Sequence, residues 1–227
     1  GGLLAAGGLG AILSPPVLGA AAFLIAEFLK ISYLDVIRMA VIPTILFYLS
    51  LFVMVELDAR RFHSAAVGIE ADRPWMLIRR HGYHFISLVA VIAFMVVGFS
   101  PMMSVFWATV LAVATSYLRR RLVGALADGS RGVLGVAATC AGAGLIVGVV
   151  TLTGLGLKFS GIVIDYAGGS LALTALYTAL LVWIVGLAVP VTASYIICAV
   201  VAAPALIQVG VPDFAAHMFI FYYAVLS

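Results

Sequence analysis

The chain has 227 residues, of which 65% are hydrophobic and 9% are charged, with a formal net charge of +3. A soluble domain carries about 25% charged residues, so this chain has too little polar surface to cover a water-soluble globule. The composition therefore excludes soluble enzymes and nucleic-acid-binding domains as first interpretations. No apolar segment alternates apolar and polar residues as barrel strands do, so we expect an all-α polytopic membrane protein.

Apolar segments of different lengths follow one another along the chain. They cover residues 17–29, 36–55, 85–98, 103–118, 132–152, 171–189, 191–208 and 214–227. A membrane-spanning helix needs about 20 residues, which the last segment lacks, and residue 1 is Gly rather than Met. We therefore interpret the chain as an internal piece of a longer membrane protein.

The first of these segments follows a stretch without charge that is rich in helix breakers, residues 5–17. Glycines 7, 8 and 10 allow the backbone to leave helical geometry, and Ser14 before Pro15 is typical of an N-cap with proline at the first helical position. We expect an unwound segment here, with a new half-helix starting at Pro15. The alternative is a span with a simple proline kink. Unwound backbone at membrane depth is tolerated only where it is buried in protein or lines a polar cavity.

Nine of the twelve basic residues lie in two loops that flank one pair of spans. They are Arg60, Arg61, Arg73, Arg79 and Arg80 in the first loop, and Arg119, Arg120, Arg121 and Arg131 in the second. Such clusters are typical of cytoplasmic loops, and the uncharged turn at residues 99–102 predicts a helical hairpin between them. The alternative, a surface for anionic lipid or nucleic acid, is weakened by the four acidic residues of the first loop.

Residues 166–212 form a second stretch without charge, with a break in its middle at residues 186–194. Pro190 suits a helix start, and Thr192 and Ser194 supply hydroxyl groups. Because a loop at the membrane surface usually carries charge, we expect this turn to be the tip of a re-entrant hairpin. Two broken helices in different parts of one membrane protein point to a secondary transporter, although channels and some intramembrane enzymes also contain them.

Several motifs resemble one transporter family. Residues 7–23 (GGLGAILSPPVLGAAAF) resemble the Gly-rich double-proline signature of the large membrane subunit of tripartite ATP-independent periplasmic (TRAP) transporters. The form of this signature in the present chain contains PPV and GAAAF and is followed by AEFL. This form resembles the fused permease of the TAXI subgroup. Residues 146–160, 190–196 and 210–219 are similar to further parts of this family.

The resemblance implies an elevator-type carrier built from inverted repeats with broken helices and re-entrant hairpins. It implies sodium-coupled import of a small organic anion, a carboxylate, across the bacterial inner membrane, with no enzymatic activity and no cofactor besides the coupling ion. The implied partners are a periplasmic substrate-binding protein, a small membrane subunit that is separate or fused, and the bilayer. The alternative is a channel-like or scaffold subunit whose Gly/Pro breaks serve helix packing.

The resemblance also implies which residues bind substrate and ion. Those of the first repeat are Gly8, Gly10, Ser14, Pro15 and Pro16, and those of the second hairpin tip are Gly186, Pro190, Thr192, Ala193 and Ser194. Sodium is expected at Gly10, Ser14, Thr192 and Ser194. The family's first hairpin would precede Gly1 and its second double-proline motif would follow Ser227, so we do not expect this piece to transport alone. The family usually has a small or polar residue after the tip proline, where this chain has Val191.

These interpretations divide the chain into four parts. Residues 1–57 are the end of the first repeat, with the unwound helix and a span, and residues 58–82 are the Arg-rich cytoplasmic loop. Residues 83–131 are the connecting hairpin and second loop, and residues 132–227 are the second repeat with its tip near 186–194. The acids nearest the spans, Glu27, Glu56 and Asp165, are expected at membrane interfaces.

Overall fold

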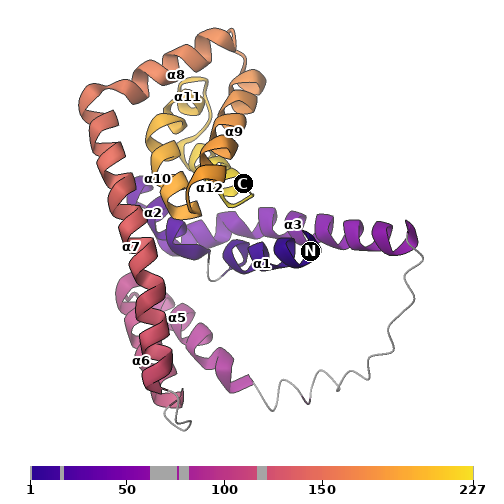
Figure 1. Cartoon of the computed structure of the whole chain (residues 1–227), viewed down its shortest axis with the longest axis vertical. Coiled ribbons are helices and arrows are strands. Elements are labelled where there is room, and N and C mark those ends of the chain that lie inside the picture. The colour runs from indigo at the N-terminus through magenta and orange to yellow at the C-terminus, as the bar shows by residue number, and fades with distance from the viewer. Residues whose placement is uncertain (1, 16–17, 62–75, 77–81, 117–121, 227) are drawn as a thin grey trace. The chain divides into compact units, whose positions relative to one another are not determined.

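The computed structural model describes residues 2–15, 18–61, 76, 82–116 and 122–226 (Figure 1). Within these ranges the chain forms helices and no strand, which confirms the predicted all-α fold. The elements are α1 (Gly2–Leu13), α2 (Gly19–Leu29), α3 (Tyr33–Arg61), the 3₁₀ turn η1 (Gly82–Phe85), α5 (Ile86–Val96), α6 (Pro101–Ser116), α7 (Leu122–Thr153), α8 (Leu155–Tyr166), α9 (Leu171–Ala188), α10 (Val191–Val201), α11 (Ala203–Gln208) and α12 (Asp213–Leu226).

Three of the described helices are long and apolar enough to cross a membrane: α3, α7 from Leu126 onward, and α9. The shortest, α9, has 18 residues, and at about 1.5 Å per residue it approaches the ~30 Å hydrocarbon thickness. In the most apolar 18-residue stretch of each helix, only 11% of α3, 6% of α7 and 22% of α9 is buried within the chain. Their remaining surface is therefore left for lipid or for other protein, as a polytopic membrane protein requires.

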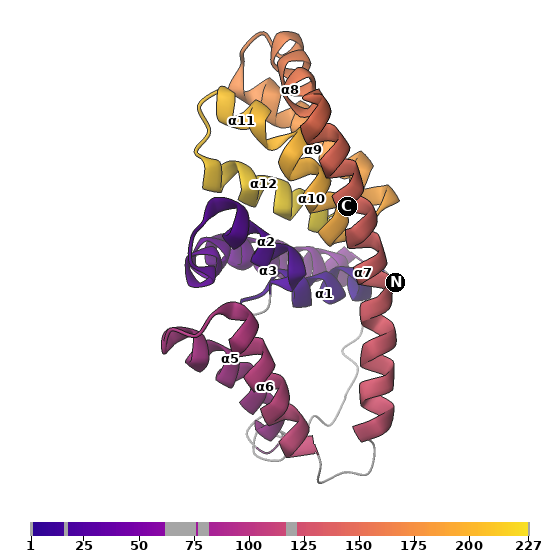
Figure 2. The same cartoon turned by 90° about the vertical axis from the view of Figure 1, so that its left-hand side faces the viewer.

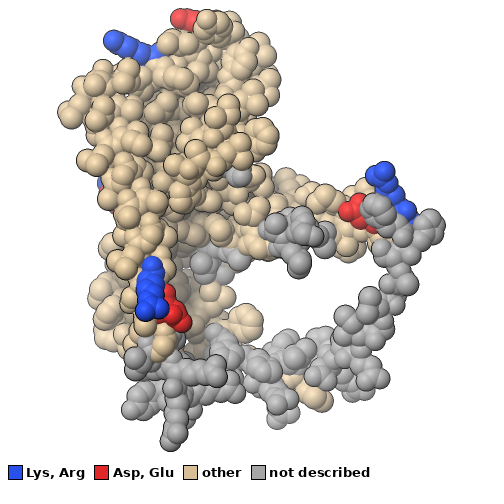
Figure 3. Space-filling model, in the orientation of Figure 1, with Lys and Arg blue, Asp and Glu red and all other residues tan. Residues whose placement is uncertain are grey.

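The surface of the described residues is apolar over most of its area. On the face shown in Figure 3, charged side chains lie at only a few places, and the rest of the described surface is uncharged. Large side chains are exposed on the long helices, including Phe52 of α3 and Leu152 of α7 at 69% and 90%. Such a surface suits hydrocarbon and would aggregate in water.

The helices fall into two compact units. The larger unit comprises residues 1–45 and 130–227, and the smaller comprises residues 46–129. The helices α3 and α7 each have one end in each unit. Both predicted helix breaks lie in the larger unit, so the candidate site is described from that unit alone.

Within the larger unit, α12 and α10 have the most neighbours. The helix α12 packs against α1, α2, α9, α10 and α11, while α10 packs against α2, α8, α9 and α11 (Figure 2). The buried residues at these contacts are mainly small: alanines 21, 22, 193, 199, 203, 205, 216 and 224. Small side chains let helix backbones approach closely, which is how helices associate in lipid, where no hydrophobic force drives them together.

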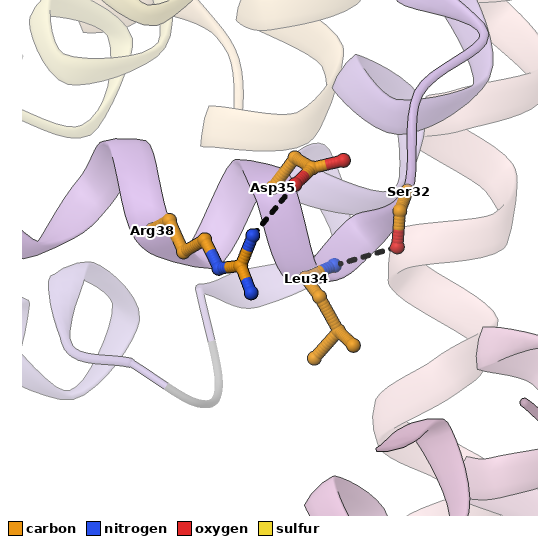
Figure 4. A network of polar contacts seen from close by, with 4 residues as sticks. All are labelled: Ser32, Leu34, Asp35 and Arg38. Carbon is orange, nitrogen blue, oxygen red and sulfur yellow. Dashed lines mark hydrogen bonds and ion pairs between the residues drawn. The ribbon is translucent and has the colours of Figure 1, made fainter. Parts of the chain in front are cut away.

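The helix α3 begins with a capped first turn (Figure 4). The Ser32 hydroxyl accepts a hydrogen bond from the Leu34 backbone N–H at 3.2 Å, as an N-cap residue does. Asp35 lies in the first turn, where the helix dipole favours a negative charge, and it pairs with Arg38 at 3.5 Å. The ion pair is exposed and adds little stability. The cap makes Tyr33 the first residue of α3.

In the smaller unit, α5 and α6 form the helical hairpin that the uncharged turn predicts. Gly98 has a φ of +102°, which favours glycine, and the Ser100 hydroxyl accepts a hydrogen bond from the Met103 N–H at 3.3 Å. Pro101 is the first residue of α6, where its missing N–H has no cost. The turn thus follows from capping chemistry that is readable in the sequence.

Two helices differ in extent from the prediction. We expected a span over 132–152 with Arg131 in a loop, but α7 begins at Leu122 and contains Arg131. Residues 122–131 contain no proline, so the helix extends past the apolar stretch. Residues 155–166 form α8, although we did not predict an apolar segment there. Gly154, with a φ of +66°, separates α8 from α7.

The predicted segment 191–208 is also two helices, because α10 ends at Val201 and α11 begins at Ala203. Pro204 has no N–H to give to the Val200 carbonyl. The helix α8 covers this break: the Ser160 hydroxyl lies 3.2 Å from the Val201 carbonyl oxygen and 2.9 Å from the Gly156 carbonyl oxygen of its own helix. A polar group on a neighbouring helix thus compensates for the interruption.

Candidate functional site

The first break lies between α1 and α2. The helix α1 ends at Leu13, and α2 begins at Gly19, whose φ of +71° turns the chain into the new helix. The prediction of a break is confirmed, but the predicted cap is wrong, because the N-cap residue is Leu18. The Ser14 hydroxyl instead donates to the Gly10 carbonyl at 2.5 Å and closes the last turn of α1.

The glycines and prolines of this segment have different roles from those predicted. Gly7, Gly8 and Gly10 lie inside α1, so the expectation that they unwind the backbone is wrong. Glycine costs a helix only about 1 kcal/mol relative to alanine, which packing readily offsets. Pro15 lies in the break, half-buried, while Pro16 lies outside the described residues. Pro15 ends α1, because proline disfavours helical geometry at the residue before it.

Two side chains of α3 bind the two ends of this break. The Thr44 hydroxyl donates to the Leu13 carbonyl at 2.7 Å, and the Tyr33 hydroxyl accepts from the Leu18 N–H at 3.5 Å. The Tyr33 ring also stacks on Phe23 of α2, with centroids 4.3 Å apart. The sequence analysis missed both residues, since nothing local marks a hydroxyl as the partner of a backbone group 15 or 31 residues away.

The second break separates α9 from α10 at the predicted place. The helix α9 ends at Ala188, Val189 is extended with φ −139° and ψ 154°, and Pro190 is the N-cap residue of α10. The Pro190 carbonyl accepts the first hydrogen bond of α10, from the Ser194 N–H at 2.9 Å. The prediction that Pro190 marks a helix start is confirmed, one residue before the first helical residue, Val191.

The residues assigned to this tip differ in burial. Gly186 lies in the last turn of α9, and Thr192 is half-buried in the first turn of α10. Ala193 and Ser194 are buried, at 3% and 0% exposure. The Ser194 hydroxyl lies beside the Cys198 thiol, a weak hydrogen-bonding group, and has no stronger partner among the described residues. A buried polar group in this state costs about 1–3 kcal/mol, which a bound ion or water would relieve.

A second buried hydroxyl, that of Thr178 in α9, is also without a partner in the described part of the chain. Its neighbour one turn earlier, Thr174, donates to the Ser170 carbonyl at 2.9 Å and is thereby satisfied. The sequence analysis did not select Thr178. Its signal would have been two threonines one helical turn apart in an otherwise apolar span.

The second halves of the two broken helices pack against each other and against α12. Where they meet, the Tyr195 hydroxyl of α10 lies 2.8 Å from Nδ1 of His217 on α12. The Phe28 ring of α2 lies 6.2 Å from the Tyr195 ring and 6.1 Å from the His217 ring, between centroids. His217 thus contacts protein on α2 and α10.

The acidic residues nearest the spans are exposed. Glu27 pairs with Lys30 and is 72% exposed, and Glu56 pairs with Arg60 at 2.7 Å. Asp165, near the end of α8, is also exposed. The first predicted basic loop lies largely outside the described residues, which include Arg60 and Arg61 at the end of α3.

The two breaks offer oxygen atoms and helix ends, and the stretches that contain them, residues 1–26 and 166–212, hold no Asp, Glu, Lys or Arg. Helix N-termini carry partial positive charge and suit an anion, while hydroxyl and carbonyl oxygens suit a small hard cation. Broken helices that meet in the middle of a membrane protein supply both kinds of group in secondary transporters. The groups at the two breaks can therefore serve as ligands of an ion.

A protein-family model matches the chain. The whole chain, residues 1–227, matches the family described as "Tripartite ATP-independent periplasmic transporter, DctM component". No curated protein and no solved structure matches the chain. The family match covers both helix breaks and every described helix, and an all-α membrane fold agrees with it. The chain belongs to the DctM component family, the large membrane subunits of TRAP transporters.

Proposed function

We propose that the chain is the sodium-coupled permease of a secondary transporter that imports a small organic anion, a carboxylate. The family is one of membrane permease components, which are not enzymes. The finer statements, sodium coupling and a carboxylate substrate, come from the family resemblance, and the chemistry of the two breaks is compatible with them. In this proposal the permease moves in an elevator-type cycle between inverted repeats, in a bacterial inner membrane.

One observation carries the proposal: two helix breaks without charge whose second halves, α2 and α10, pack against each other. The two stretches that contain them, residues 1–26 and 166–212, hold no Asp, Glu, Lys or Arg. Broken helices in hydrocarbon leave polar backbone groups that need a partner, so they are retained where a ligand binds. A site without carboxylates matches a weakly held monovalent coupling ion, since Ca²⁺ sites usually contain several.

The roles follow from the residue types. Oxygens of Gly10, Ser14, Thr192 and Ser194 are the proposed ligands of sodium. The N-termini of α2 and α10 are the proposed partners of the substrate carboxylate. Pro15 and Pro190 interrupt the helices beside these groups, Gly186 lies in the last turn of α9, and the small Ala193 lies beside the tip. Gly8 lies inside α1, and Pro16 lies outside the described residues.

The proposed partners are those of the family: a periplasmic substrate-binding protein that delivers the anion and a small membrane subunit, separate or fused. Delivery by such a protein explains why a permease site can lack a charged residue, because selection of the substrate occurs elsewhere. No cofactor other than the coupling ion is needed.

The test is uptake into proteoliposomes that contain the transporter carrying this chain, with its binding protein outside. The probe is a radiolabelled carboxylate, chosen by screening small carboxylic acids for thermal stabilisation of the binding protein. We expect uptake under an inward sodium gradient and none when choline replaces sodium. Uptake that persists without sodium, or that requires ATP, would contradict the coupling.

Variants then test the assigned residues. Ser194→Ala and Thr192→Val should raise the sodium concentration for half-maximal uptake by roughly fivefold or more, since each removes one ligand. Thr139→Val is the matched control, because the Thr139 hydroxyl donates to a carbonyl of its own helix, α7. Passive flux without coupling would instead favour the channel-like alternative, and equal sodium affinity in all variants would contradict the site.

A further inference from the structure

The buried face of α3 lies against the first break. Its buried residues are Tyr33, Val36, Ala40 and Thr44, at 2%, 0%, 0% and 8% exposure. Tyr33 and Thr44 are eleven residues apart, about three helical turns, so they project from the same side of the helix. The rest of α3 is largely exposed. This face is therefore the side of α3 that packs against the other helices of the larger unit.

The two hydroxyl groups on this face serve the two backbone groups that the break leaves without helical partners. The last carbonyls of a helix and the first amides of the next one have no intrahelical hydrogen bonds. Thr44 binds the Leu13 carbonyl at the end of α1, and Tyr33 binds the Leu18 amide at the start of α2. Leu13 and Leu18 are both fully buried, so water does not compete for these groups.

The helix α12 joins this arrangement. The Tyr222 hydroxyl donates to the Ala40 carbonyl at 3.1 Å and also contacts the Thr44 side chain. Five residues earlier on the same helix, His217 contacts Tyr195 of α10. The helix α12 therefore contacts both α3, whose hydroxyl groups bind the first break, and α10, the helix that follows the second break.

We infer that Thr44 and Tyr33 are positioning residues that hold the two ends of the first break for cation binding. The inference rests on the proposed function, because it assigns the cation to oxygens beside this break. Without the two hydrogen bonds, the end of α1 with Ser14 and the start of α2 would sample a wider range of separations. An ion that needs several oxygens at once would then bind less tightly, while the side chains that contact the ion would be unchanged.

The experiment measures sodium binding without a substrate. The purified transporter carrying this chain is melted in increasing sodium chloride, with choline chloride holding ionic strength constant, and the half-saturating sodium concentration is read from the rise in Tm. Thr44→Val and Tyr33→Phe each remove one hydroxyl and keep the side-chain volume. We expect both to raise the half-saturating concentration roughly two- to tenfold, the range for one hydrogen bond.

Controls separate positioning from general loss of stability. Thr44→Ser keeps the hydroxyl and should restore wild-type sodium affinity even if its Tm in choline is lower. Thr139→Val and the exposed Tyr166→Phe make the same chemical changes elsewhere and should leave sodium affinity unchanged. If Thr44→Val does not fold, Tyr33→Phe carries the test, since its ring still stacks on Phe23.

The outcomes distinguish the two claims. No sodium-specific rise in the Tm of the wild-type protein would overturn the proposed function, and this inference with it. Sodium stabilisation of the wild type with unchanged half-saturation in both Thr44→Val and Tyr33→Phe would overturn the inference alone. In that case a lower Tm in choline would show that the two hydroxyls serve only stability.

Discussion

Gly19→Ala should destabilise the larger unit by about 2–3 kcal/mol. Gly19 has a φ of +71°, a left-handed conformation that costs a residue with a Cβ roughly 1–2 kcal/mol. A Cβ there would also lie 2.9 Å from Cγ2 of Ile12, well inside the ~3.5–4.0 Å contact distance, and moving that side chain off its rotamer costs about 1 kcal/mol more. The residue is the first of α2, so no helix propensity is gained.

The assay is thermal unfolding of the purified protein, followed by tryptophan fluorescence. For a chain of this length, about 2–3 kcal/mol corresponds to a fall in Tm of roughly 5–10 °C. Gly142→Ala is the matched control, because Gly142 lies inside α7 with open space around its Cα, and alanine should raise helix stability by up to about 1 kcal/mol.

A double-mutant cycle separates the two causes. Ile12→Ala removes the atom that the new Cβ would meet, so Gly19→Ala should cost about 1 kcal/mol less in the Ile12→Ala background. An unchanged Tm for Gly19→Ala would refute the turn geometry at α2. A loss of stability without any coupling to Ile12 would refute the close contact and leave the φ angle as the sole cause.

Three further substitutions test the packing of the larger unit by the same unfolding assay. Gly156→Ala places a Cβ 2.9 Å from the Val200 carbonyl oxygen, a backbone atom that cannot turn aside, so a loss of about 1–3 kcal/mol is expected; wild-type stability would contradict the close approach of α8. Tyr195→Phe removes the 2.8 Å contact with His217 and should cost about 1–3 kcal/mol, with no loss counting against a buried hydrogen bond. Thr178→Val replaces an unpartnered buried hydroxyl by a methyl group and should be neutral or stabilising, so a clear loss of stability would reveal a partner for that hydroxyl.

Both breaks could be predicted from the sequence because proline acts locally. Pro15 and Pro190 mark breaks because helix-disfavouring residues surround them in stretches without charge, whereas Pro43 lies inside α3 without ending it. Pro204 is also a helix-breaking proline, but the apolar composition of residues 191–208 predicts one continuous span there. Gly7 and Gly8 show the opposite error, since glycine permits a break without requiring one.

The groups that complete the candidate site could not be predicted, because they depend on long-range contacts. Thr44 and Tyr33 are ordinary residues of an apolar helix until the fold brings the backbone of the break against them. The same holds for Ser160 and the carbonyl of Val201, 41 residues later in the chain. Only the tertiary arrangement shows which hydroxyls have strong partners among the described residues and which, like that of Thr178, have none there.

The central claim is that the helix breaks of this chain, which lie in stretches without charge, bind sodium. A structure of the transporter that carries this chain, determined once in sodium chloride and once in choline chloride, tests this claim directly. We predict density for an ion in sodium only, beside backbone or hydroxyl oxygens of one of the two breaks and within reach of the Ser14 or Ser194 hydroxyl. Sodium-dependent density elsewhere, with none at either break, would contradict the account.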